Sequence, residues 1–195
     1  MERIILKIVF GSALPIVSTL VFWWGMLLFT DHETVILVSS IIGLAGGIAI
    51  ELTAGLTKRF NVYAMPWGIA FAVFAFYCVG MFGFFMGVPV FHLILGGAAG
   101  YYCARRRMEA DPSTNQPSER TIATVSAAAM AGICIVSAAF ALSSDSTPFD
   151  LRNMLHLQFN ISIPMLWAII ISGGIALVAL QFYITKFVYN KTFSE

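Results

Sequence analysis

Glu51 is the ionisable residue that lies deepest inside an apolar segment of this chain. It precedes Lys58 by seven residues, which is about 10 Å along a helix. A charge inside a membrane costs roughly 2.5–3.5 kcal/mol on insertion scales, so such a residue usually faces a cavity or a partner. A cation or proton bound by Glu51 would make it the coupling site of a carrier. The alternative is a structural carboxylate that reaches Lys7 or a water molecule among the lipid headgroups.

His92 is the second candidate for binding a solute or ion, because an imidazole titrates near neutral pH and hydrogen-bonds readily. The alternative is a structural histidine at a membrane interface. His32 and His156 fall on the same predicted side of the membrane, but the spacing of the three gives no metal-ligand motif. Haem needs His or Met pairs that face each other across a bundle. The sequence therefore predicts no metal site and no cofactor.

Enzyme motifs are missing from the chain. It contains no G-x-S-x-G, no H-E-x-x-H and no phosphate loop. The three cysteines form no C-x-x-C pair, and no histidine is predicted at the depth of Ser126 or Ser137 to activate either hydroxyl. We therefore expect no catalytic residue and no enzyme.

The composition predicts the elements that must position these residues. The chain is 59% hydrophobic and 11% charged, whereas soluble domains carry about 25% charged residues. Runs of about 20 apolar residues, the length that crosses a bilayer, recur along it. We predict an all-α polytopic membrane protein, a single domain over 1–195 with one cytoplasmic loop, 105–120, and one outer segment, 143–163. The six predicted transmembrane helices cover approximately 8–29, 34–56, 63–85, 87–104, 121–142 and 164–188.

The placement of Lys and Arg predicts the orientation of this bundle. Cytoplasmic loops carry an excess of these residues. In the six-span arrangement, every Lys and Arg except Arg152 falls on one side. We therefore expect both termini in the cytoplasm and a location in the plasma or inner membrane. The same rule makes the short fourth segment, 87–104, cross the membrane, because a re-entrant loop would move Arg105 to the outer side.

A short helix is expected within the outer segment. Thr147 has the residue type of an N-cap, Pro148 that of the first helical position and Asp150 that of the third. Apolar residues then recur on one face, which is typical of a helix that lies on a membrane surface.

An internal repeat of three plus three spans is a further hypothesis. Four residues of the second span match four of the fifth at a constant offset. Each half would contain three spans, and because that number is odd the two halves would have inverted topology, as in transporters. The matches are Ile36, Ser40, Ala45 and Gly46 with Ile122, Ser126, Ala131 and Gly132.

Small residues spaced four apart predict where the helices pack. Lipid supplies no hydrophobic drive for helix association, so close backbone approach at small residues is the main means of packing. The alternatives are a dimer interface or thin helix walls around a solute. The predicted packing glycines are Gly43, Gly47, Gly83, Gly87, Gly96, Gly100 and Gly132.

Three functions are compatible with these features. The first is a small membrane transport protein, or the membrane-embedded substrate-binding subunit of a transporter, with Glu51 and His92 as polar contacts to a small solute or ion. The second is a non-catalytic scaffold subunit that packs against a second copy or a membrane partner through Gly/Ala faces. The third is a membrane enzyme with an outer site near His92 and His156. The lipid bilayer is the expected environment, and the net charge of +1 gives no reason to expect nucleic acid.

Overall fold

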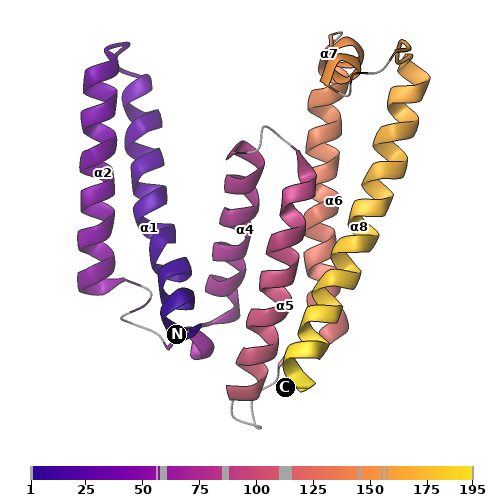
Figure 1. Cartoon of the computed structure of the whole chain (residues 1–195). Coiled ribbons are helices and arrows are strands. Elements are labelled where there is room, and N and C mark those ends of the chain that lie inside the picture. Colours follow the sequence, from indigo (N-terminus) through magenta and orange to yellow (C-terminus); the bar gives the residue numbers. More distant parts are fainter. Residues whose placement is uncertain are drawn as a thin grey trace. The chain divides into compact units, whose positions relative to one another are not determined.

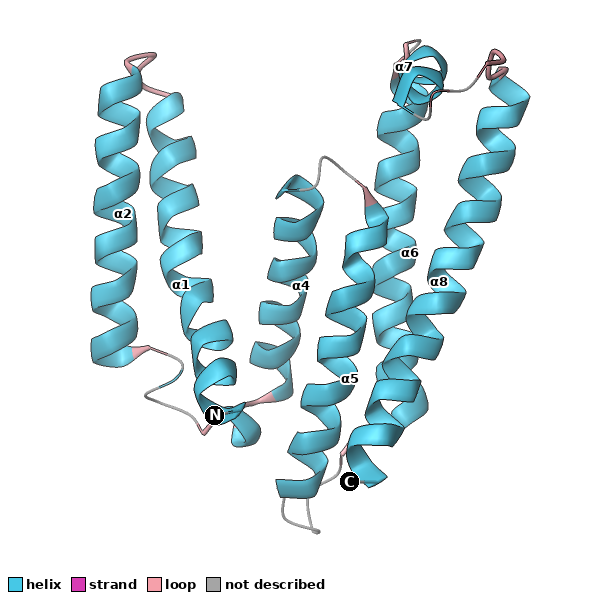
Figure 2. Ribbon diagram, viewed as in Figure 1, coloured by secondary structure: helices cyan, strands magenta, loops and turns pink. Residues whose placement is uncertain are grey.

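The part of the chain that the structure describes is mainly helical and has no strands, in agreement with the all-α prediction (Figures 1 and 2). This computed structural model describes residues 2–55, 57, 61–84, 88–109, 116–144, 146–154, 156 and 158–194. The chain divides into two compact units, Met1–Phe76 and Tyr77–Glu195. Within these ranges, four helices are long and apolar enough to cross a membrane: α1 (Glu2–Leu27), α2 (Glu33–Ala54), α6 (Glu119–Ser143) and α8 (Ile163–Ser194).

In the first unit, α1 and α2 form a closely packed hairpin (Figure 1). Gly43 and Gly47 of α2 lie against α1. A Cβ atom added to Gly43 would lie 2.8 Å from the Ser18 carbonyl oxygen, and one added to Gly47 would lie 2.6 Å from Pro15 Cα. Both distances are shorter than a real Cβ tolerates, so the absence of a side chain permits this backbone approach.

The predicted third span, 63–85, is divided in two. A 3₁₀ turn, η1 (Val62–Ala64), comes first, and its N-cap Asn61 accepts a hydrogen bond from the Tyr63 amide, 3.3 Å away. The helix α4 (Trp67–Phe84) begins only after Pro66. A residue before proline is disfavoured in the α region, and Met65 is accordingly extended, with ψ at 139°. The sequence prediction therefore began this helix four residues early.

In the second unit, α8 packs against both α5 (His92–Glu109) and α6. A second 3₁₀ turn, η2 (Pro89–Phe91), precedes α5. Relative to the predicted span 87–104, α5 begins five residues later and continues into the predicted loop 105–120. Gly87 lies outside the described residues.

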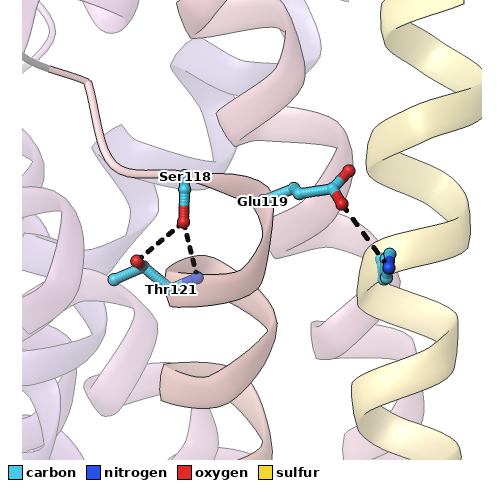
Figure 3. A network of polar contacts seen from close by, with 4 residues as sticks. Ser118, Glu119 and Thr121 are labelled. Atoms are coloured by element: carbon cyan, nitrogen blue, oxygen red, sulfur yellow. Dashed lines mark hydrogen bonds and ion pairs between the residues drawn. The ribbon is translucent and has the colours of Figure 1, made fainter.

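The first turn of α6 is joined to α8 by polar side chains (Figure 3). Ser118 is the N-cap, and its hydroxyl accepts a hydrogen bond from the Thr121 amide at 3.2 Å. Glu119 pairs with Lys186 of α8 at 3.5 Å, with both side chains about one-third exposed. An acidic residue in the first turn also complements the helix dipole. These contacts fix where α6 begins beside α8.

The short outer helix is present as α7 (Thr147–Met154). Its start is one residue from the predicted arrangement, because Ser146 rather than Thr147 takes the capping position. The Asp150 amide donates to the Ser146 carbonyl at 2.9 Å, and the Ser146 hydroxyl donates to Asp150 Oδ2 at 2.8 Å. The Ser146–Asp150 pair thus closes the first turn.

Candidate functional site

Glu51 lies buried in the last turn of α2. Its Oε1 atom accepts two hydrogen bonds from Thr57, one from the backbone amide at 3.0 Å and one from the hydroxyl at 2.6 Å. Gly11 of α1 faces the same carboxyl group, since a Cβ added there would lie 3.4 Å from Glu51 Oε1. The chain that leaves α2 therefore folds back over Glu51.

The Glu51 side chain both accepts hydrogen bonds that hold the local structure and carries a group able to bind a cation. Glu51 holds the end of α2 through Thr57, a contact that the sequence interpretation did not name. A carboxylate at a helix C-terminus faces the negative end of the dipole. A cation bound by this carboxylate would offset that repulsion.

His92 is the first residue of α5 and is only 2% exposed. Its Nε2 atom lies 2.8 Å from the carbonyl oxygen of Cys78 on α4. The ring nitrogen on the other side, Nδ1, is buried and has no hydrogen-bond partner in the structure. Because a carbonyl oxygen only accepts, the proton resides on Nε2 and leaves Nδ1 as an acceptor in the neutral ring.

A second polar cluster lies between α6 and α8. Ser126 Oγ accepts hydrogen bonds from Gln181 Nε2 at 2.9 Å and from Thr185 Oγ1 at 3.1 Å. All three side chains are buried, and Gln181 is 2% exposed. The amide oxygen Gln181 Oε1 is buried and has no hydrogen-bond partner among the described residues. The cluster thus has an unused acceptor.

Two glycines of α5 lie against this cluster. A Cβ added to Gly96 would lie 2.7 Å from Gln181 Oε1, and one added to Gly100 would meet the Thr185 backbone oxygen. His92, Gly96 and Gly100 are spaced four apart, so they occupy one face of the helix. His92 therefore lies one turn along α5 from the glycine that contacts the Gln181 amide.

The structure distributes the predicted residues between the two units. Glu51, Gly43 and Gly47 belong to the first unit, and His92, Gly96 and Gly100 to the second. Gly83 and Gly132 have no neighbouring atom within 4 Å of an added Cβ, so neither lies at a close helix contact in the structure. His156 is exposed, unlike His92.

Similarity to other proteins does not identify this site. Comparisons with protein-family models, curated proteins and solved structures found no match. Among the described residues, no group of three or more His, Cys, Asp or Glu side chains could hold a metal ion. The site must therefore be interpreted from its own hydrogen-bonding chemistry.

The sequence interpretation missed Gln181 and Thr185, and it considered Ser126 only as a packing residue. One signal was available. Gln181 and Thr185 are spaced four apart within an otherwise apolar helix, which places two polar side chains on one face. Polar side chains in such a helix usually turn toward the bundle interior.

Proposed function

We propose that the protein is a small multi-pass membrane transport protein, or the membrane-embedded solute-binding subunit of one. One observation carries this proposal: in the buried cluster with Ser126 and Thr185, the acceptor Gln181 Oε1 has no hydrogen-bond partner among the described residues. Buried polar groups within membrane helices are costly and commonly mark substrate or ion pathways. A cluster needed for packing alone would gain by satisfying every acceptor.

The chemistry of the cluster suggests the kind of solute. Its members are an amide and two hydroxyls, none of them charged at neutral pH. Gln181 Oε1 accepts hydrogen bonds, as does the neutral His92 ring at Nδ1 one turn along α5. The expected solute is therefore small, uncharged at the bound end and rich in N–H or O–H donors.

The proposed topology has six spans with both termini in the cytoplasm. α4 and α5 supply the third and fourth crossings in addition to the four long apolar helices. Eighteen residues extend about 27 Å, close to the hydrocarbon thickness of about 30 Å. A three-plus-three repeat would relate α1, α2 and α4 to α5, α6 and α8.

Glu51 is proposed as the proton or cation coupling site. Its carboxyl group accepts two hydrogen bonds from Thr57, so the group that would take up the proton or cation is held in a fixed position. Neutralisation of the carboxylate on proton binding is the simplest way for a buried acid to couple solute movement to a proton gradient.

Uptake into proteoliposomes tests the transport role. Purified protein is reconstituted with an internal pH-sensitive dye, and amino acids, nucleosides and water-soluble vitamins are supplied outside under an imposed proton gradient. We expect at least one compound to accelerate proton entry in the wild type and none to do so in Glu51→Gln. Solute-driven proton entry at the wild-type rate in Glu51→Gln would remove the coupling role.

The scaffold alternative is favoured by one observation. Gly132 of α6 lies on an exposed surface with open space around its Cα. A second copy or a partner helix that packs there would use the close approach that small residues allow. Gly132→Leu would then shift the purified protein to a smaller species in size-exclusion chromatography with light scattering, whereas the transport proposal expects no shift.

A further inference from the structure

Arg107 is held by two aromatic side chains at the end of α5. Its Nη1 atom donates a hydrogen bond to the Tyr189 hydroxyl at 3.0 Å. The guanidinium carbon lies 5.5 Å from the centre of the Phe193 ring, within range of a cation–π contact. The Tyr189 and Phe193 rings are themselves nearly parallel, with centres 6.1 Å apart and 9° between the planes. The C-terminal turns of α8 thus fix the position of the guanidinium group.

The charge of Arg107 is not neutralised by this arrangement. Tyr189 and Phe193 are uncharged, and the structure places no carboxylate oxygen within 4 Å of this guanidinium among the described residues. Lys186, on the same end of α8, differs because Glu119 pairs with it. Arg107 is exposed and keeps further N–H donors that the Tyr189 bond does not use. It is a positioned cation without an anionic partner among the residues that the structure describes.

The length of α8 places this cation at the level of the lipid headgroups. The helix has 32 residues, about 48 Å at 1.5 Å per residue, whereas the hydrocarbon core is about 30 Å thick. If α8 enters the hydrocarbon near Ile163, the hydrocarbon ends about 20 residues later, near Phe182. Tyr189 and Phe193 then lie beyond it, where the phosphate groups of phospholipids are found.

We propose that Arg107 is a binding site for the headgroup phosphate of an anionic phospholipid. The planar guanidinium matches phosphate oxygens in a two-pronged hydrogen-bonding geometry. Phe193 is 49% exposed beside it and offers an apolar contact to the glycerol and upper acyl chain. A soluble phosphate compound would use the same charge but would gain nothing from Phe193, so the site favours a lipid.

Binding of defined lipids tests this site. Native mass spectrometry of the whole protein, released from detergent, is used to titrate phosphatidylglycerol and phosphatidylcholine with identical acyl chains. We expect the wild type to bind phosphatidylglycerol more tightly. Arg107→Gln should weaken that binding about tenfold or more, since a charge-assisted contact is lost. Arg107→Lys keeps the charge but loses the planar guanidinium group, so its affinity for phosphatidylglycerol should fall to a smaller degree.

Arg120→Gln is the matched control, because it removes the same charge from an exposed position in the first turn of α6. It should change the affinity by less than about twofold, as expected for a screened surface charge. Tyr189→Phe keeps every charge but removes the hydroxyl that positions Arg107, so it should weaken binding and provides a test even if Arg107→Gln misfolds. Equal losses in Arg107→Gln and Arg120→Gln would mean bulk attraction and would overturn the proposal. Equal binding of the two lipids, or full displacement by inorganic phosphate at matching concentration, would also overturn it.

Discussion

Ser126 determines how the buried polar cluster is held together. One hydroxyl oxygen accepts from both Gln181 and Thr185, so it joins two positions of α8 to α6. Ser143, in the last turn of the same helix, is exposed and donates a hydrogen bond to the carbonyl oxygen of Phe140 within its own helix at 2.8 Å. The hydrogen bonds at Ser126 join two helices, whereas this bond of Ser143 stays within one helix.

Replacement of Ser126 by alanine should destabilise the protein. The change leaves Gln181 Nε2 and Thr185 Oγ1 without their acceptor, and hydrogen bonds between membrane helices average about 0.6 kcal/mol, with a maximum of about 1.7 kcal/mol. We expect a loss of about 1–2 kcal/mol in the free energy of unfolding, measured in detergent by denaturant titration. Ser143→Ala, which removes an exposed hydroxyl bonded within its own helix, should cost less than about 0.5 kcal/mol. Equal losses of unfolding free energy in the two variants would show that the hydrogen bonds between α6 and α8 do not stabilise the protein.

Glu51→Gln should leave the fold intact. A glutamine oxygen can accept the same two hydrogen bonds from Thr57 that the carboxylate accepts. We expect an unfolding midpoint within a few degrees of the wild type, since the change alters charge and not volume. Circular dichroism during heating in detergent measures this midpoint. A collapse of the midpoint would assign Glu51 a structural role in place of the coupling role.

At the scale of the helix, glycine spacing predicts close contact only where a neighbour is present. The pairs Gly43 with Gly47 and Gly96 with Gly100 each face another helix at a distance that an added Cβ would violate. Gly132 has the same sequence signature, with Ala128 four residues before it, but it has open space beside it. The motif permits close approach of another helix, but the tertiary arrangement determines whether a helix packs there.

Gly100→Ala should force α5 and α8 apart. An added Cβ meets the Thr185 backbone oxygen, which cannot rotate away as a side chain can. Overpacking of this kind costs about 1–3 kcal/mol, and we expect the free energy of unfolding to fall by that amount in a detergent titration. Gly132→Ala is the control and should be neutral or slightly stabilising, because alanine is the better helix former by about 1 kcal/mol. The account is wrong if Gly132→Ala is the more damaging change.

The sequence predicted most of the helices but not the polar cluster. Long apolar runs are local signals, and they placed α2 and α6 within two residues at each end. The delayed start of α4 follows from Pro66, whose effect on Met65 is also local and could have been recognised. The cluster joins Ser126 to Gln181, 55 residues apart, through the packing of α6 on α8. No local pattern specifies which helices meet.

At the scale of the whole molecule, the charge distribution is the main argument for topology. The second unit has a cationic end, where Arg107 and Lys186 lie with the first turn of α6. The positive-inside rule assigns such an end to the cytoplasm. In the proposed topology α6 and α8 each cross the membrane once, so we expect α7 at the outer surface.

Reporter fusions test this topology. A phosphatase that is active only outside the cytoplasm should be active when inserted within 143–163 and inactive within 105–120. A fluorescent reporter that folds only in the cytoplasm should show the reverse pattern. Matching activity of one reporter at both sites would mean that the segment between them does not cross the membrane as proposed.

Solute binding at Gln181 tests the central claim most directly. The purified protein is heated in detergent with each member of a panel of amino acids, nucleosides and water-soluble vitamins, and the unfolding midpoint is recorded. A ligand present at ten times its dissociation constant should raise the midpoint by about 3–6 °C. The account predicts that at least one compound gives this shift in the wild type and in Ser137→Ala, and that Gln181→Leu abolishes it. An unchanged shift in Gln181→Leu, or no shift with any compound in the wild type, would contradict the account.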